Sequence, residues 1–166
     1  MASARRAVTP DTLGAWVLKA SPRVFPVQGL LDSHFRTVTH RCVRAGYRTR
    51  LVVPDQPVLF WVSGGDPARP AGFYAQGRTT GVPIRSEGGH APTDPRLDLP
   101  VALEPLDPPV LREELRAHPD LCRLEVLRMA AGSNPSFVSR IELQELRARW
   151  PHVAAAGGPS LSPVDR

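Results

Sequence analysis

Two apolar runs with a polar segment between them form the clearest pattern in the chain. Residues 58–62 read VLFWV, residues 71–75 read AGFYA, and residues 63–70 between them are rich in Gly, Pro, Ser and Asp. Short runs of β-branched and aromatic residues bounded by such turn formers are typical of strands. The pattern therefore predicts a central hairpin with a long polar tip. Because residues 58–62 are almost continuously apolar, we expect their strand to be covered on both faces.

Three further strands are predicted around this hairpin. Residues 14–20 alternate loosely and place Trp16 and Leu18 on one face. Residues 37–43 are rich in Thr and Val, and residues 97–106 alternate apolar with polar positions. We therefore expect a sheet assembled from segments that are far apart in the sequence.

Short helices are expected between and after the strands. Asp107 followed by two prolines predicts a helix start, because proline fits a first turn and the Asp side chain can accept hydrogen bonds from free amides. Ser139 and Glu142 form a capping-box pattern ahead of a final helix that ends near Trp150, with Leu143 and Leu146 on its buried face. The helix that starts at Asp107 is expected to run through residues 110–117, and the other expected helical segments are residues 24–31 and 121–127.

Length and composition indicate one loop-rich domain. A chain of 166 residues corresponds to a single domain with a core of its own, and its 19 prolines favour short elements over a helical bundle. We expect a flexible leader over residues 1–13, the folded domain over residues 14–150, and a disordered tail over residues 151–166. Residues 81–95 are predicted to form a mobile surface loop.

The basic residues are concentrated near the start of the chain. Residues 1–50 contain nine basic and two acidic side chains, whereas residues 84–127 contain five basic and nine acidic ones. Such asymmetry is compatible with a basic face that attracts phosphate backbones, and equally with a solvated arginine-rich surface.

Several kinds of chemistry lack a signal in the sequence. The chain contains no phosphate-binding glycine motif and no nucleophile-elbow motif, and its five histidines have no zinc-ligand spacing, so we expect no cofactor and no metal. Isolated Cys42 and Cys122, the absence of a secretory leader and the lack of an apolar run of about 18 residues together predict a reduced, cytoplasmic protein that does not enter a membrane.

The remaining candidate groups are aromatic rings, small polar side chains and arginines. Rings on which a base can stack, with a few polar groups to contact its edge, are the parts that recognition of a single base requires. Each aromatic taken alone is equally compatible with core packing. The candidate ligand-binding residues are Trp16, Lys19, Ser21, Tyr47, Trp61, Ser63, Gly64, Ser133 and Asn134, with Tyr74 as a further ring. The candidate phosphate-binding residues are Arg41, Arg44, Arg48 and Arg50.

Four blocks of sequence resemble a known family. In order, they read WVLKASP from Trp16, VRAGYR from Val43, PVLFWVSG with AGFYAQG from Pro57, and RMAAGSNPS from Arg128. Together they cover about residues 14–150 and resemble the EVE domain, a member of the PUA-like superfamily. The resemblance implies an α+β fold, a small mixed β-barrel with short flanking helices. It also implies a pocket for a base, often a modified one, that is flipped out of DNA or RNA.

The resemblance assigns the candidate residues to the family's blocks and also shows one departure. Lys19, Ser63 and Asn134 are expected to contact the base edge, and the arginines are expected to engage phosphates. Members of the family commonly carry Trp just ahead of the Val-Arg step, where this chain has His40 and Arg41. Either Arg41 stacks in its place through the guanidinium plane, or the ligand preference differs.

Three functions remain open on the sequence alone. The first is a non-enzymatic module that reads a base in nucleic acid and works beside a separate restriction or processing partner. The second is a small hydrolase or nuclease, as relatives of the ASCH type suggest, in which Lys19 beside Ser21 is the catalytic candidate. The third is a protein-interaction accessory module whose aromatics all belong to the core.

Overall fold

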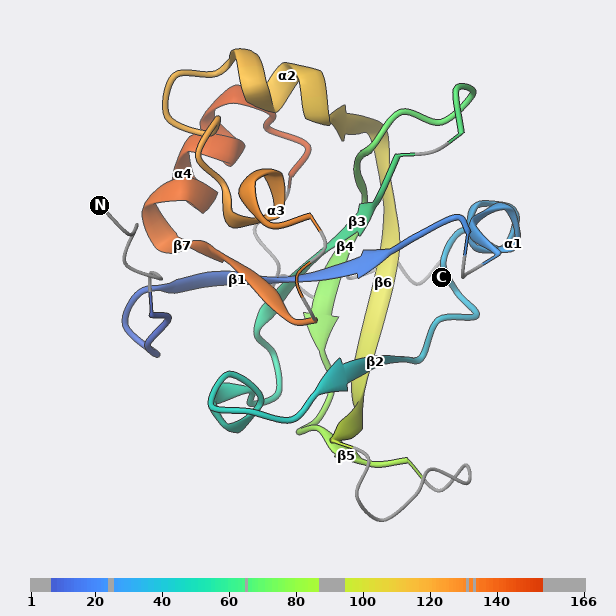
Figure 1. Ribbon diagram of the computed structural model, residues 1–166, viewed down its shortest axis with the longest axis vertical. Helices are drawn as coiled ribbons and strands as arrows, with labels where there is room; N and C mark the ends of the chain where they lie inside the picture. The colour runs from blue at the N-terminus through green and yellow to red at the C-terminus, as the bar shows by residue number, and fades with distance from the viewer. Residues whose placement is uncertain are drawn as a thin grey trace, which may run out of the picture.

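A computed structural model of the chain describes residues 7–23, 26–64, 66–86, 95–130, 132 and 134–153 (Figure 1). Within these residues, none of the helices has the length and apolar character required to cross a membrane.

Within the described residues, seven strands form one mixed sheet that curls strongly into a half-barrel (Figure 1). Its order is β2-β6-β4-β3-β1-β7, and β5 pairs with β6 on the edge opposite to β2. β1 and β3 run parallel, and the other pairs are antiparallel. The strands are β1 (Leu13–Ala20), β2 (His40–Arg44), β3 (Pro57–Val62), β4 (Gly72–Thr79), β5 (Ile84–Arg85), β6 (Arg96–Leu111) and β7 (Ser136–Ser139).

The helices are short and occupy two places around the sheet. Figure 1 shows α2, α3 and α4 gathered on one side of the molecule, while α1 lies apart from them beyond the end of β1. The helices are α1 (Val27–Asp32), a 3₁₀ turn (Thr49–Leu51), α2 (Arg112–Ala117), α3 (Glu125–Arg128) and α4 (Arg140–Arg149). The fold is therefore α+β, with a curled sheet as its framework.

The sheet separates two hydrophobic cores, because alternate residues of a strand point to opposite faces. Trp16, Leu18 and Phe60 lie in the core inside the curl, together with residues of α1, β2 and β6. Val17 and Trp61 lie in the other core, which α2, α3 and α4 cover. Both β1 and β3 are thus buried on both faces, as the continuous apolarity of residues 58–62 predicts.

Several predicted elements are confirmed. The central hairpin is β3 and β4, and the first strand is β1. The capping box is formed: Glu142 N donates to Ser139 Oγ at 3.3 Å, and Ser139 N donates to the Glu142 carboxylate at 2.8 Å. Trp150 ends α4 and is buried.

The prediction of a helix start at residues 107–109 is wrong. β6 continues through both prolines and pairs Val110 with Phe73, and α2 begins only at Arg112. Leu111 takes the N-cap position, where its amide donates to the Glu114 carboxylate at 2.9 Å. Pairing with β4 therefore outweighs the local preference of proline for a first helical turn.

Other differences concern the edges of the domain. β7 was not predicted, and β5 lies within the predicted loop over residues 81–95, of which residues 87–94 lie outside the described residues. Val8, within the predicted leader, is buried in the core inside the curl. Most of the predicted tail, from residue 154 onward, lies outside the described residues.

Candidate functional site

A polar seam joins the end of β1 to β2, two strands that are not neighbours in the sheet. β7 pairs with β1 only as far as Val17. Beyond that point the Asn134 side chain replaces the ladder: Lys19 N donates to Asn134 Oδ1 at 2.8 Å, and Asn134 Nδ2 donates to Lys19 O at 3.1 Å. From β2, Arg41 Nη2 donates to Lys19 O at 3.0 Å and Arg44 N donates to Asn134 O at 2.9 Å. These contacts connect the two ends of the curled sheet.

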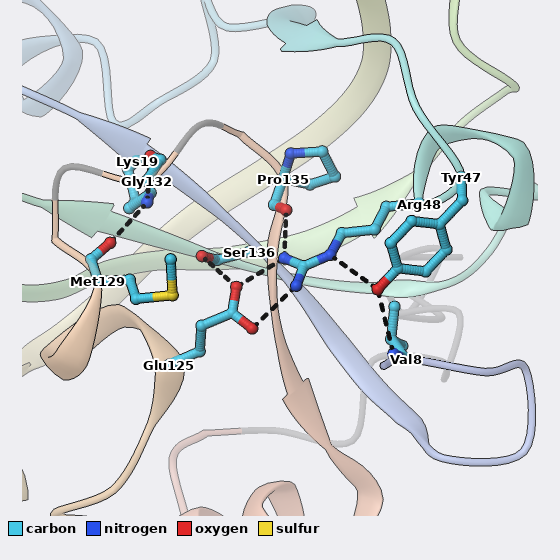
Figure 2. A network of polar contacts seen from close by, with 9 residues as sticks. All are labelled: Val8, Lys19, Tyr47, Arg48, Glu125, Met129, Gly132, Pro135 and Ser136. Atoms are coloured by element: carbon cyan, nitrogen blue, oxygen red, sulfur yellow. Dashed lines mark hydrogen bonds and ion pairs between the residues drawn. The ribbon is translucent and has the colours of Figure 1, made fainter. Parts of the chain in front are cut away.

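The Lys19 ammonium lies inside this seam and has backbone partners. Its Nζ donates to the carbonyl oxygens of Met129 and Gly132, and the side chain is buried (Figure 2). Burial lowers the pKa of Lys19, and the nearby Glu125 carboxylate opposes that shift. Lys19 therefore holds the turn after α3 against β1, and its amino group is directed at carbonyls rather than toward an open surface.

Arg48 and Glu125 form a second part of the seam. Figure 2 shows the guanidinium between the carboxylate and the backbone: Arg48 donates to Glu125 at 2.6 and 3.1 Å and to Pro135 O at 3.1 Å. Ser136 Oγ donates to the same carboxylate at 3.1 Å. Burial disfavours the charged guanidinium, but hydrogen bonds to Glu125 and to the Tyr47 hydroxyl outweigh that cost and raise the pKa of Arg48. This bidentate pair links the segment after β2 to α3 and β7.

A pocket of about 440 Å³ opens between α1 and β2, next to the seam. This volume lies in the range of small-molecule sites, roughly 300–1,000 Å³. Its apolar lining comes from α1 and the segment before β2, and the polar residues of its lining are threonine, histidine, arginine, cysteine and aspartate. The lining residues are Pro26, Gly29, Leu30, Thr37, Val38, Thr39, His40, Arg41, Cys42 and Asp98.

The chain forms the wall of this pocket through an unusual turn. After α1, His34 and Phe35 both adopt positive φ, 50° and 61°, which costs roughly 1–2 kcal/mol for each residue. Phe35 is nonetheless buried, and its ring packs edge-on against Phe60 at 5.5 Å between centroids. Packing of the Phe35 ring thus holds the strained turn, which brings residues 37–42 across from α1. Strain that packing maintains in this way is common beside functional sites.

The predicted aromatic cage of Trp16 and Trp61 is wrong. The two rings are 0% and 2% exposed and lie in different cores, on opposite faces of the sheet. Trp16 Nε1 donates to Gln56 Oε1 at 2.7 Å, so its polar edge is satisfied in the interior. Tyr74 is also buried, and its hydroxyl donates to Pro70 O at 2.6 Å. These three rings pack rather than line a cavity.

The other predicted site residues are divided between the seam and the hairpin. Tyr47 is exposed and contacts Arg48, outside the pocket lining. Ser63 N donates to Ala20 O at 2.9 Å, so Ser63 and Gly64 follow β3 near the end of β1, beside Ser21. Ser133 lies outside the described residues.

The structure adds site residues that the sequence did not indicate. Glu125 is separated from Arg48 by 77 positions, and no spacing rule connects them. Thr37, Thr39 and Asp98 line the pocket without forming any motif. His40 and Cys42 flank Arg41 on a predicted strand, and alternation alone places both on the face opposite to Arg41. No group of three His, Cys, Asp or Glu side chains suited to a metal ion occurs in the described part of the chain.

Comparison with known proteins gives a likeness of fold. No family model and no curated protein matches the sequence. Among solved structures, the chain is similar to Rpa0253 from Rhodopseudomonas palustris, with 12% identity over 86% of this chain and 97% of that chain and a TM-score of 0.59. It is similar to a hypothetical protein from Leishmania major, with 16% identity over 85% and 96% and a TM-score of 0.58. It is also similar to Atu2648 from Agrobacterium tumefaciens, with 14% identity over 87% and 96% and a TM-score of 0.56. At such low identities the likeness concerns the fold alone, and nearly the whole length of each of these small proteins has a counterpart in this chain.

Proposed function

We propose that this chain is a non-enzymatic nucleic-acid-binding module, an EVE domain of the PUA-like type, that seats one base in the pocket between α1 and β2. The observation that carries the proposal is the pocket itself. It has the volume for a flat heterocycle, and an arginine of a basic strand forms part of its lining.

The pocket offers what a single base needs. Leu30 and Val38 give apolar contacts for the ring faces, while Thr37 and Thr39 give hydroxyl groups that donate or accept. Recognition of a base in single-stranded or flipped form depends on such a combination of a flat apolar surface and a few polar groups. These groups replace the tryptophan cage that the sequence suggested.

Exposed arginines at and beyond the end of β2 would hold the phosphate backbone. Arg44 and Arg50 are exposed, one at the end of β2 and one in the 3₁₀ turn. Arg48, in contrast, is paired with Glu125, so we assign it to closure of the seam. Phosphate contacts fix the position of a nucleic acid without reading its sequence, which leaves selection to the pocket.

The resemblance of four sequence blocks to the EVE domain supports the same function. The blocks span about residues 14–150, and they contribute Lys19, Arg44, Arg48 and Asn134, all of which lie in the polar seam. The family's base pocket is thus proposed at the place where this seam borders α1. The bound base would often be a modified one, as in the family.

Binding of short oligonucleotides tests the proposal. Fluorescence anisotropy should detect binding of labelled DNA or RNA at low salt, and oligonucleotides with one methylated cytosine or adenine should bind more tightly than unmodified ones. The logarithm of the affinity should fall with the logarithm of salt concentration by about 0.7 for each phosphate that is neutralised on a single strand. Arg44→Gln and Arg50→Gln should each weaken binding of all sequences alike and reduce that slope by about 0.7.

Arg123→Gln is the matched control, because Arg123 is exposed in the segment between α2 and α3, away from the pocket. This variant should bind as the parent protein does. Failure of every DNA and RNA to bind at low salt would overturn the proposal, as would an equal effect of the three substitutions.

A further inference from the structure

Gly29 lies in the middle of α1, where glycine is the least suitable residue after proline. Glycine is a poor helix former, and α1 has only 6 residues. The backbone of Gly29 does not adopt the positive φ that favours glycine, and a Cβ placed on it would meet no atom of the described residues within 4 Å. Neither the path of the chain nor the packing of the described residues therefore requires glycine at this position.

Other glycines of the sheet have a packing reason that Gly29 lacks. A Cβ at Gly14, Gly72 or Gly77 would collide with the backbone of a neighbouring segment. These three residues let strands approach closely, as glycine commonly does inside a sheet. At Gly29 the corresponding space is open, so the reason for glycine lies outside the contacts of the free protein.

The open space in front of Gly29 belongs to the pocket. Pro26, Gly29 and Leu30 all line the pocket, and their spacing of three and four positions places them on one face of α1. The helix is held in place by other residues: Val27 is buried in the core inside the curl, and the Gln28 side chain accepts a hydrogen bond from the hairpin tip. A ligand in the pocket can therefore approach the α1 backbone at Gly29 with no side chain between them.

A helix backbone that is open at one glycine admits a larger ligand than one covered by side chains. The missing side chain leaves room for a methyl group of the ligand or for the edge of a second ring. Each ligand methyl group that is removed from water in such a place favours binding by about fourfold. A methyl group on the protein at the same place would instead overpack the filled site.

We propose that Gly29 sets the size of the base that the pocket admits, and that the bulkiest edge of the bound base packs on the α1 backbone at this residue. The favoured ligands are then purines and bases that carry an added methyl group. This inference rests on the proposed function and names the ligand class within it. It makes Gly29 a specificity-determining residue.

Labelled oligonucleotides that differ in one central base test the proposal. The central bases are cytosine, 5-methylcytosine, adenine and N6-methyladenine, and an abasic oligonucleotide gives the contribution of the sugar–phosphate backbone alone. In fluorescence anisotropy, the parent protein should bind adenine more tightly than cytosine. It should bind at least one methylated base about fourfold more tightly than the unmethylated form.

Gly29→Ala fills the proposed space from the protein side. This variant should lose the fourfold gain from the ligand methyl group, and it should weaken binding of adenine by about tenfold while affecting cytosine less. Its Tm should rise by about 2 °C, because alanine is the better helix former and its Cβ meets open space. A rise in Tm together with weaker binding separates the loss of ligand from any loss of fold.

Gly46→Ala is the matched control. Gly46 lies between β2 and the 3₁₀ turn, outside the pocket lining, and a Cβ placed on it would also meet no atom of the described residues within 4 Å. The same substitution at Gly46 should leave every ratio among the oligonucleotides as it is in the parent protein.

The outcomes distinguish this inference from the function on which it rests. Base preferences in Gly29→Ala equal to those of the parent protein would overturn the inference while leaving nucleic-acid binding intact. A fall in Tm of Gly29→Ala would also overturn it, because the space in front of Gly29 would then not be open. A change of ratios in Gly46→Ala as large as that in Gly29→Ala would do the same. Absence of binding to every oligonucleotide in the set would overturn the proposed function itself.

Discussion

Tyr74 illustrates how position in the fold changes the chemistry of one side chain. Its hydroxyl is buried near the hairpin tip and donates to Pro70 O at 2.6 Å. Burial raises the pKa of Tyr74 above its ordinary value of 10.0, while nearby Arg69 opposes the shift and Asp66 adds to it. The folded state therefore retains this proton at a pH where the unfolded chain releases it.

The direction of the Tyr74 pKa shift determines how this residue makes the stability of the folded protein depend on pH. A phenol whose pKa is raised by folding contributes stability that is fully present below pH 10.0 and is lost as the pH rises beyond it. Lys19 acts in the opposite sense, because its lowered pKa makes stability rise with pH up to its ordinary value of 10.5.

Tyr74→Phe should lower the free energy of unfolding by about 1 kcal/mol at neutral pH, because the hydrogen bond is lost. Urea unfolding at pH values from about 8 to about 11 measures the difference in unfolding free energy between Tyr74→Phe and the parent protein. This interval extends about two units below and about one unit above the ordinary pKa of tyrosine. The difference should shrink above pH 10.0. A difference that stays constant or grows with pH would contradict the assigned burial of this hydroxyl.

At the scale of elements, the polar seam takes the place of a strand pairing. The Asn134 side chain makes two hydrogen bonds with the backbone of Lys19, one in each direction, as a neighbouring strand would. Its own carbonyl accepts from Arg44 N on β2. Asn134 thus connects β1, through its side chain, to the edge of β2, through its backbone carbonyl.

Removal of the Asn134 side-chain amide should lower the free energy of unfolding. Asn134→Ala leaves the N–H of Lys19 without its partner, while Lys19 O keeps the hydrogen bond from Arg41, and we expect a loss of about 1–3 kcal/mol in the free energy of unfolding. Asn134→Asp keeps an acceptor for Lys19 N and loses only the donor, so it should cost less. Denaturant unfolding measures both, and Gln144→Ala on the exposed face of α4 serves as the control. If Asn134→Ala lowered the free energy of unfolding by less than Gln144→Ala does, the polar seam would not hold the strands together.

Elements with a clear local pattern could be predicted from the sequence, and those that depend on pairing could not. The alternation in β1 and the continuous apolarity of β3 indicate strands buried on both faces, and this is what the two cores require. Pro108 and Pro109 suggested a helix because nothing local reveals that β4 extends β6 past them. β7 has only four residues, and the capping box of α4 begins at its last one, so no separate pattern remains.

The same distinction applies to the site. Lys19 and Asn134 could be selected as polar residues at strand ends and turns, and Arg41 as a candidate phosphate-binding arginine. The structure brings both Asn134 and Arg41 into contact with Lys19. Trp16 and Trp61 were misassigned because an aromatic in a pocket and one in a core have the same composition signal, and only the curl of the sheet decides between them. Asp98 had no signal at all, since its position beside the pocket depends on the register of β2 with β6.

At the scale of the whole molecule, the curled sheet separates two hydrophobic cores. α2, α3 and α4 cover one face and form a core with Trp61 and Trp150. On the other side, α1 and β2 leave a pocket open beside the polar seam. Ligand binding should therefore affect the α1 and β2 side and leave the three-helix side unchanged.

Mapping of backbone amide shifts by NMR shows which side of the molecule binds a nucleic acid. A ¹⁵N-labelled protein is titrated with a single-stranded oligonucleotide that carries one cytosine, at low salt. The largest shift changes should fall on Gly29, Leu30, residues 37–42 and Asp98, with smaller changes at Arg44 and Arg50 and none in α2 or α4. Changes concentrated in α2 and α4, or spread evenly over the surface without any at residues 37–42, would contradict the claim that a base binds between α1 and β2.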